Sequence, residues 1–490
     1  MDTQVIVVGA GPVGLLLAAE LRLGGVETVV LERLAAPSTA SRASTLHART
    51  MEFFDQRGLA AELGTPPNDG AGHFGGLPLD LGGLDTRYPG QWKVLQARTE
   101  ELLHARATDL GARILRGHLV TGLRQHPDHV EVAAQGPAGP VRLRAAYLVG
   151  CDGEESTVRQ LAGIDFPGAA ADKELLRADV DGIDIPGRRF ERFPTGMAVA
   201  ARRPDGVTRV MVHEFAFRPA PRTGPPAFAE VAAAWARVTG EAIGHGTPLW
   251  VNAFDNTCRQ AARYRLGRVL LAGDAAHQQM PVGGQALNLG LQDAANLGWK
   301  LAAEVRGRAP AGLLDSYHDE RHPLAERVLA GITAQSHLLL GGAEVDGLRA
   351  VLAELLTLDG VAEHLASGIA GLDVRYPLGP GDHPLLGARL PGFELATGPE
   401  RGDVLRLLRT GRGLLLALSG DEDRTARLAA ELRPWAGRVD FAAGRPGHGT
   451  GADLAGHDLL VRPDGHVVWA DTSGALGPAL LRWFGAPTGD

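Results

Sequence analysis

The chain has 490 residues, a formal net charge of −8 and a hydrophobic content of 44%. This length predicts about three domains and leaves ample chain for large hydrophobic cores. The acidic balance argues against a nucleic-acid-binding surface, and no run approaches the roughly 18 apolar residues of a membrane span.

The two cysteines, Cys151 and Cys258, are too few for a disulfide framework and too far apart for a metal-binding motif. We therefore expect reduced thiols in the cytoplasm. The N-terminal sequence MDTQVIVVG shows no signal-peptide pattern, which agrees with that location.

The N-terminal stretch carries a glycine-rich turn after a predicted strand. Val5 to Val8 is a continuous apolar run, as in a buried parallel strand. A G-x-G-x-x-G motif follows, and each of its glycines has a different structural role. Gly9 permits the tight turn, Gly11 the approach of a pyrophosphate, and Gly14 close packing of helix on strand.

The same unit continues with a helix pattern from Leu15 to Leu23 and a second strand from Val26 to Leu31. Glu32 stands at the end of that strand, where it can accept hydrogen bonds from ribose hydroxyls. Strand, turn, helix, strand and acidic terminus together predict a dinucleotide site. The acidic end favours NAD or FAD over NADP.

Two later strands also end in a carboxylate and a glycine. Tyr147 to Gly150 is followed by Asp152-Gly153, and Val269 to Ala272 is followed by Gly273-Asp274. Doubly wound folds bind ligands at the C-terminal edge of a parallel sheet, so we expect these segments to meet there. An ADP site with further polar contacts along a linker indicates FAD.

The segment after Asp274 has the features of a flavin-binding loop. Pro281 and the pair Gly283-Gly284 precede a helix expected from Ala286 to Arg306. Its N-terminus would point at the pyrimidine edge of the flavin and stabilise the anionic reduced form. Asp274 would bind the ribityl hydroxyls.

The remaining pattern predicts further units. Residues 165 to about 265 form a β-rich insertion, and residues 341 to 386 are partly helical. From Leu390 onward a β-α-β unit, a hairpin and a last helix predict a thioredoxin-like domain without cysteines. Earlier in the chain we expect a short strand at His73 to Leu77 and a helix from Thr99 to Leu110, capped by Thr99.

The sequence closely resembles the single-component (class A) FAD-dependent aromatic hydroxylases of the para-hydroxybenzoate hydroxylase fold, over nearly the whole chain. The motifs are GAGPVG with Glu32, CDGEESTVR at 151–159 and GDAAHQQMPVGGQALNLGLQDAANLGWKLA at 273–302. SRASTLHARTMEFFDQRG at 41–58, LQARTEELL at 95–103 and LLVRPDGHVVW at 459–469 are similar to actinomycete polyketide hydroxylases and rifampicin monooxygenases. Ala286 departs from the usual glycine.

The resemblance implies an α/β fold with a Rossmann-like (GR2-type) FAD-binding domain made of residues 1–72, 96–165 and 266–345. The β-rich substrate domain would comprise 73–95 and 166–265. A helical linker at 346–386 would lead to the thioredoxin-like domain at 387–490.

The resemblance also implies a set of FAD contacts. Those near the ADP moiety are Gly9, Gly11, Pro12, Val13, Gly14, Glu32, Arg33 and Val120. Those near the linker or ring are Arg42, Gln96, Arg98 and Asp274, with Pro281, Gly283, Gly284, Ala286, Leu287 and Asn288 at the isoalloxazine. Asp152 would have an indirect part in the cofactor site, because its Asp-Gly segment in this family touches both FAD and the nicotinamide cofactor. Pro281, Gly283 and Gly284 would form the catalytic face. No acid or base is assigned, no metal is expected, and His277 is interpreted as a packing residue.

The activity implied by the resemblance is hydroxylation of a polycyclic aromatic, polyketide-type substrate by a monomer or homodimer. NAD(P)H would bind transiently and reduce FAD, and oxygen would be transferred from a flavin C4a-hydroperoxide. A substrate wall is expected from His73–Leu77, Arg209–Phe217 and the residues around 190.

Alternatives stay open at this stage. A rifampicin-type antibiotic-inactivating monooxygenase would use the same chemistry, and only substrate assays separate the two. Baeyer–Villiger oxygenation would be recognised from the product. A flavin halogenase is disfavoured because the seven tryptophans are isolated. A flavoprotein scaffold or redox sensor would bind flavin that NAD(P)H does not reduce.

Overall fold

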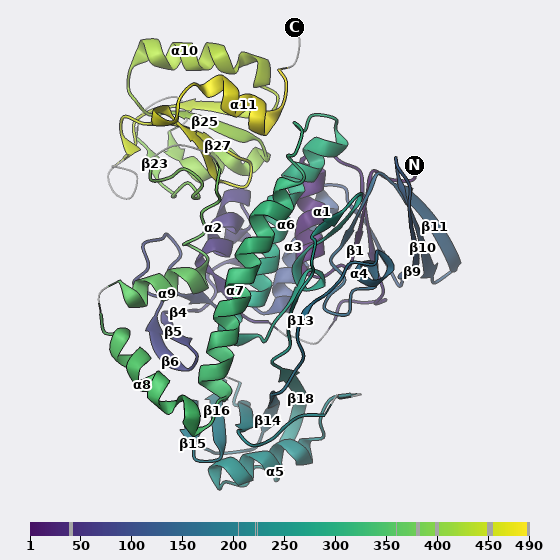
Figure 1. The fold of residues 1–490 in the computed structure, drawn as a ribbon, viewed down its shortest axis with the longest axis vertical. Coiled ribbons are helices and arrows are strands. Elements are labelled where there is room, and N and C mark those ends of the chain that lie inside the picture. Colours follow the sequence, from purple (N-terminus) through teal and green to yellow (C-terminus); the bar gives the residue numbers. More distant parts are fainter. Residues whose placement is uncertain are drawn as a thin grey trace.

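The structure is a computed structural model that describes residues 1–38, 43–203, 205–220, 222, 224–358, 360–378, 383–396, 401–447 and 454–487. Its elements form three bodies along the long axis (Figure 1). A parallel sheet with its helices lies in the middle, a five-stranded sheet at one end and the C-terminal sheet at the other. The long helix α7 (Ser316–Leu340) runs beside all three.

The central sheet has six strands in the order β20-β21-β12-β1-β2-β8. Every neighbouring pair is parallel except β20 and β21. The strands are β1 (Val5–Val8), β2 (Thr28–Glu32), β8 (Arg113–Arg116), β12 (Tyr147–Gly150), β20 (Arg265–Leu266) and β21 (Val269–Leu271). The first strand and the strand at Tyr147 to Gly150 have the bounds predicted from their apolar runs.

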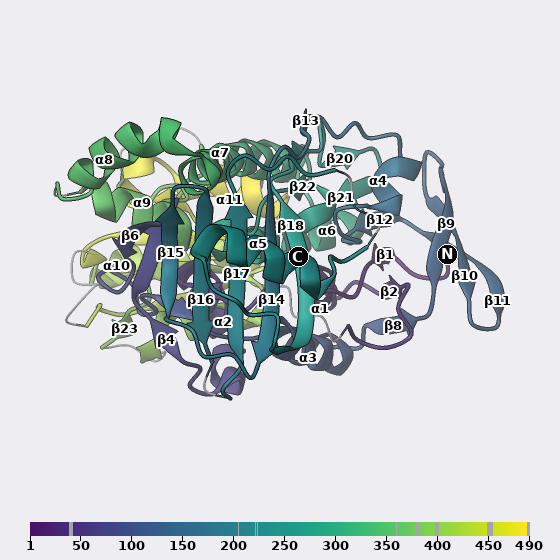
Figure 2. The ribbon, with the colours of Figure 1, turned by 90° about the horizontal axis from the view of Figure 1, so that it is seen from below.

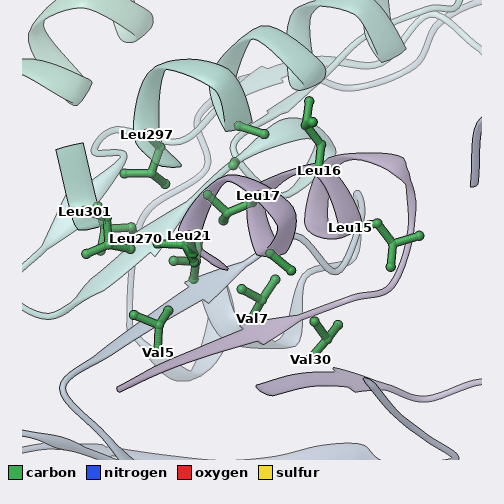
Figure 3. Close-up of a cluster of buried hydrophobic side chains, with 14 of the residues drawn as sticks. Val5, Val7, Leu15, Leu16, Leu17, Leu21, Val30, Leu270, Leu297 and Leu301 are labelled. Atoms are coloured by element: carbon green, nitrogen blue, oxygen red, sulfur yellow. The ribbon is translucent and has the colours of Figure 1, made fainter. Parts of the chain in front are cut away.

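Helices α1 (Pro12–Leu23) and α6 (Gln285–Val305) pack against each other over this sheet. Figure 3 shows leucines of both helices meeting valines of the strands in one apolar cluster. The helices approach closely because α6 has glycine at Gly298, where a Cβ would lie 2.4 Å from Glu20 Cβ. Burial of this cluster fixes the glycine-rich turn at the start of α1.

A three-stranded antiparallel meander consists of β9 (Leu119–Gln125), β10 (Val130–Gly136) and β11 (Gly139–Ala145). The prediction that Thr99 caps α3 (Gln96–Asp109) is wrong, because Leu95 is the N-cap. The Gln96 backbone N–H donates to the Ala43 carbonyl (3.0 Å), so the helix starts three residues earlier. Thr99 is buried inside it.

The five-stranded sheet is antiparallel throughout, with the order β15-β16-β17-β14-β18. Helix α5 (Phe228–Thr239) covers its outer face, as seen from below in Figure 2. Trp235 of α5 is fully buried there. The strands are β14 (Glu174–Asp181), β15 (Arg188–Phe193), β16 (Gly196–Arg202), β17 (Thr208–Glu214) and β18 (Thr247–Asp255).

The predicted strand at His73 to Leu77 is wrong. The segment is the turn of a hairpin, β5 (Ala71–Phe74) and β6 (Leu77–Asp80), in which Gly75 and Gly76 have φ of 56° and 83°. The hairpin packs on α9 (Val361–Ala370) and joins no strand of the five-stranded sheet within the described ranges.

The C-terminal sheet has the order β26-β25-β27-β28, with β25 and β26 parallel and the other pairs antiparallel. This is the predicted β-α-β unit followed by a hairpin and a helix. Its elements are β25 (Gly413–Ala417), α10 (Glu422–Leu432), β26 (Val439–Ala443), β27 (Asp458–Val461), β28 (Val467–Ala470) and α11 (Leu476–Phe484). The bounds of the domains stay a prediction.

The other elements connect these bodies. Helix α2 spans Ala48–Arg57, α4 Thr157–Leu161 and α8 Asp346–Leu355. The short strands are β3 (Leu46–His47), β4 (Asn68–Asp69), β7 (Gln91–Trp92), β13 (Gly168–Ala169), β19 (Cys258–Gln260), β22 (His277–Gln278), β23 (Glu394–Leu395) and β24 (Gly402–Asp403).

Candidate active site

The C-terminal ends of four adjacent parallel strands form one edge, in the order β21, β12, β1 and β2. This edge carries the Gly273-Asp274, Asp152-Gly153 and glycine-rich turns, followed by Glu32. Backbone hydrogen bonds join the strand ends, such as Cys151 N–H to the Val8 carbonyl at 2.7 Å. The predicted convergence of these segments is therefore confirmed.

The three glycines of the turn have different surroundings. A Cβ at Gly9 would lie 2.3 Å from the Cys151 carbonyl oxygen, and one at Gly14 would lie 2.0 Å from the Gly9 carbonyl oxygen. Both glycines are thus required by the packing of the chain itself. A Cβ at Gly11 would meet no atom within 4 Å. Gly11 is the N-cap of α1, and Pro12 follows as the first helical residue.

The start of α1 has the features of an anion site. No described side chain caps this end, so its first-turn N–H groups keep their hydrogen-bonding capacity. Val13 packs against Gly273, whose Cβ would lie 3.0 Å from Val13 Cγ2. The contact holds the turn of β21 beside that of β1, and the space above Gly11 stays open.

Glu32 lies beside the same turn and is 9% exposed. One carboxylate oxygen accepts from Ala10 N–H (2.7 Å) and the other from Leu34 N–H (2.8 Å). Each oxygen retains acceptor capacity for a ribose hydroxyl. Val120 is buried at the start of β9, next to the end of β2, and Arg33 is exposed there.

The carboxylate of Asp152 forms hydrogen bonds within the protein. Its carboxylate accepts from Ser156 Oγ (2.5 Å) and Val158 N–H (3.1 Å), which fixes the start of α4. Burial raises the pKa of Asp152 despite these hydrogen bonds, which act in the opposite direction. Any contact of this carboxylate with FAD stays a prediction.

Asp274 is exposed in the turn after β21. The turn is fixed from below by a buried network of hydrogen bonds and ion pairs that the sequence did not predict. Asp293 of α6 accepts from Gly273 N–H (3.1 Å) and from Arg321 Nε (2.7 Å), and its carboxylate lies 2.8 Å from His277 Nε2. His277 is thus a buried structural residue, as interpreted. Burial alone would raise the pKa of Asp293, but the charges of Arg321 and His277 lower it.

The loop before α6 is shaped by left-handed backbone. Gly283 and Gly284 have φ of 65° and 71°, and Gly284 is the N-cap of α6. No side chain among the described residues caps this end. Pro281 is exposed, and Ala286 and Leu287 are partly exposed. The first-turn N–H groups of α6 can therefore face an electron-rich ligand.

Asn288 ties the start of α6 to β3. Its amide nitrogen donates to the carbonyls of Gly284 (2.8 Å) and Thr45 (3.1 Å), and its amide oxygen accepts from His47 N–H (2.9 Å). The sequence did not predict the contacts with Thr45 and His47, because both residues lie more than 200 positions away along the chain.

His47 lies beneath the loop and was also missed. It is buried, its Nδ1 lies 2.7 Å from the Ile369 carbonyl, and its Nε2 has no partner in the described structure. A Cβ at Gly284 would lie 3.3 Å from that Nε2. Burial lowers the pKa of His47 to about 4 in spite of the hydrogen bond to Ile369, so its ring is neutral at pH 7.

Three residues predicted near the linker or ring have other placements. Gln96 accepts from Ala43 N–H (3.1 Å) and donates to Glu100 (2.8 Å). Arg98 is exposed and donates to Glu101 (2.8 Å) and to the Glu62 carbonyl (2.9 Å). Arg42 lies outside the described residues. Direct FAD contact by these three stays a prediction.

The inner face of the five-stranded sheet lies opposite the loop. Leu175, Met197 and Val199 pack in one apolar cluster with Met280 and Val282. Partly buried residues extend this cluster, namely Phe190, Met211, Phe215, Phe254 and Val328. Of the predicted substrate wall, His73 contacts the Phe190 ring with centroids 4.2 Å apart.

A small cavity and a cluster of two histidines and a glutamate lie away from the sheet edge. A cavity of about 50 Å³ between α2, α6, α7 and α9 is far below the several hundred Å³ of drug-sized ligand sites. His126 and His129 of the β9–β10 turn lie close to Glu131 of β10, which also forms an ion pair with Arg144.

The residues at the sheet edge fit FAD. The uncapped start of α1 with open space at Gly11 suits a pyrophosphate, and Glu32 suits a ribose. The uncapped start of α6 suits the electron-rich edge of a flavin. No helix in the described ranges is long and apolar enough to cross a membrane.

Family models and curated relatives match the chain closely. A model described as FAD binding domain matches residues 2–331, and one described as aromatic-ring hydroxylase, C-terminal, matches residues 383–487. The 12-dehydrotetracycline 5-monooxygenase/anhydrotetracycline 6-monooxygenase of Streptomyces rimosus is 44% identical over 99% of this chain and 100% of its own length. A rifampicin monooxygenase of Streptomyces venezuelae is 42% identical over 99% of both chains. A dialkyldecalin synthase of Streptomyces rugosporus is 40% identical over the same shares.

A solved structure extends the likeness to the whole fold. The crystal structure of CabE, an aromatic hydroxylase from angucycline biosynthesis, superposes with a TM-score of 0.95 at 48% identity, covering 99% of this chain and 100% of that one. The sheet edge, both helix starts and these matches agree. The chain belongs to the family of FAD-dependent aromatic-ring hydroxylases.

Proposed function

We propose that this monooxygenase hydroxylates a polycyclic aromatic molecule of the polyketide type. The observation that carries the proposal is the apolar inner face of the β-rich sheet, which packs around the loop at the start of α6. Flat aromatic rings fit a wall of Phe, Met and Val side chains. Relatives that act on tetracycline precursors support this substrate class.

Bound FAD would supply hydride acceptance from NAD(P)H and activation of O2. The start of α1 would bind the pyrophosphate, Glu32 the ribose, and Asp274 the ribityl chain. The first turn of α6 would stabilise negative charge at the pyrimidine edge. Met280 and Val282 would exclude water from the reacting atoms. We further propose a cytoplasmic location, which the two free cysteines support.

The test is substrate-stimulated NAD(P)H oxidation by the FAD-loaded enzyme. Anhydrotetracycline and other polycyclic phenols should increase the rate and yield a product that has gained one oxygen atom. NAD(P)H oxidation that only forms hydrogen peroxide with every such phenol would contradict the proposed substrate class.

The names of two relatives suggest alternative activities that the same assay would reveal. Rifampicin as the preferred substrate would indicate the antibiotic-inactivating activity named for one relative. Formation of a decalin product without NAD(P)H consumption would indicate a synthase activity, in line with the relative named as a dialkyldecalin synthase. A lactone product would instead indicate Baeyer–Villiger oxygenation.

A further inference from the structure

Arg177 lies on β14 and faces the interior between the β-rich sheet and the flavin-binding body. Its neighbours Leu176 and Ala178 belong to the cluster beneath α5 on the outer face. Successive residues of a strand point to opposite faces, so Arg177 shares the inner face with Leu175. Leu175 packs in the cluster that contains Met280 and Val282.

The guanidinium of Arg177 lies against aromatic rings. Its central carbon is 4.3 Å from the centroid of the Trp250 ring and 5.8 Å from that of Phe254. Phe254 also packs in the cluster around the loop before α6. Arg177 is thus placed at the border of the apolar wall to which we assign the substrate.

Arg177 is only 6% exposed. Within the described residues we find no hydrogen bond or ion pair of its guanidinium, and its Nε is buried without an acceptor. The nearby Asp179 is already engaged, because both of its carboxylate oxygens accept from Arg209 at 2.7 Å. Arg203 also contacts Asp179, at 3.3 Å.

A buried cation without an acceptor is unfavourable for the free protein, since arginine is almost never fully buried unless it is paired. Burial and the charge of Arg209 lower its pKa to about 10, so the side chain is still charged at pH 7. An anion that enters beside Trp250 would supply the missing acceptors. A planar two-oxygen anion matches the guanidinium fork.

We propose that Arg177 binds an anionic oxygen pair, a carboxylate or an enolised dicarbonyl, carried by the aromatic substrate whose rings contact Trp250 and Phe254. The substrate would then be an acidic polycyclic aromatic. This inference rests on the proposed function for the identity of the ligand, but it is tested by binding alone.

The test compares matched ligands by isothermal titration calorimetry on the FAD-loaded protein without NAD(P)H. One pair is anthraquinone-2-carboxylate and its methyl ester; the other is 2-hydroxy-1,4-naphthoquinone, an enol acid, and its methyl ether. We expect at least one anion to bind about tenfold more tightly than its neutral partner. The pair that shows the preference identifies the type of anion.

Arg177→Gln should abolish that preference while leaving the affinity for the neutral partner within about twofold. Arg203→Gln is the matched control, because it removes the same charge from an exposed position directly after β16 and should keep the preference. Equal affinity for both members of each pair in the wild type would overturn the proposal, as would an unchanged preference in Arg177→Gln.

A second variant separates binding from folding. If Arg177 serves a ligand, Arg177→Met removes an unpaired buried charge and should raise the melting temperature of the ligand-free holoenzyme. An unchanged or lower melting temperature would overturn the proposal, because the buried guanidinium would then carry no cost that a bound anion could relieve. Failure of every phenol to stimulate NAD(P)H oxidation would contradict the proposed function. It would not affect the binding results, because those are measured without NAD(P)H.

Discussion

Gly11 and Gly14 lie three residues apart, and we expect the same substitution to impair FAD binding at Gly11 but folding at Gly14. Gly11→Ala adds a methyl group into open space, at φ −77°, which any residue adopts. The apoprotein should keep its melting temperature, while FAD affinity should fall about tenfold or more because the methyl group occupies the approach of the pyrophosphate. Equilibrium dialysis with FAD measures this.

Gly14→Ala is the complement, because its Cβ would lie 2.0 Å from the Gly9 carbonyl oxygen. It should lower the melting temperature of the apoprotein itself. If Gly11→Ala also destabilised the apoprotein, or if Gly14→Ala left it unchanged, the division of duties between the two glycines would be refuted.

Replacing Asp293 tests the buried network that links Gly273, His277 and Arg321. Asp293→Asn leaves the charge of Arg321 without its counter-charge, so we expect a loss of stability of about 3 kcal/mol and weaker retention of FAD as the Gly273 turn loosens. Thermal unfolding with flavin-release fluorescence measures both. Asp319→Asn, on an exposed position of α7, should change neither. Equal effects of the two variants would contradict the role assigned to the network.

At the scale of elements, Asn288 decides how firmly the start of α6 is held against β3. Asn288→Ala removes three hydrogen bonds and should let the first turn of α6 move away from the flavin edge. If α6 stabilises the reduced flavin, its midpoint potential should fall by about 10–40 mV, the equivalent of a helix-terminus interaction. Spectroelectrochemical titration measures this shift. An unchanged potential in a variant that still binds FAD would show that α6 does not act on the flavin.

The elements also show where sequence reasoning succeeds. Strand ends such as Val5–Val8 and the turns after them follow from local patterns, and their shared edge follows from the rules of parallel sheets. The partners of Asp293 and His47 do not follow, because each depends on residues brought together only by the tertiary fold. The hairpin at His73 was missed because two adjacent glycines interrupt the strand period.

At the scale of the whole molecule, a buried ion cluster joins the C-terminal unit to the flavin-binding body. Glu320 of α7 accepts from Lys300 of α6 (2.8 Å) and from both terminal nitrogens of Arg462 (2.7 and 3.0 Å). Arg462 follows β27 and also binds Asp464 (2.5 Å). Trp299 of α6 adds apolar contact with the C-terminal sheet. Because all four charged side chains are buried, loss of one leaves its partners uncompensated.

This cluster makes the stability of the assembled chain depend on pH in a defined window. Burial alone would raise the pKa of Glu320, but the charges of Arg462 and Lys300 lower it from 4.5 to about 2. Unfolding therefore raises the proton affinity of this carboxylate. Its contribution is fully present above about pH 4.5 and is lost as the pH falls toward 2. Lys300, whose pKa burial lowers to about 8, adds stability as the pH rises from 8 to 10.5.

Glu320→Gln should therefore destabilise the protein by about 3–5 kcal/mol at pH 7, because Lys300 and Arg462 keep buried charges without their shared partner. The variant should also lose stability less steeply than the wild type between pH 4.5 and 2. In calorimetry we expect the C-terminal unit to unfold in a separate, earlier transition, since Arg462 anchors it. Glu326→Gln, on an exposed position of the same helix, should follow the wild-type profile. A single transition with the wild-type acid slope in Glu320→Gln would show that apolar packing around Trp299 holds the two bodies together without this cluster.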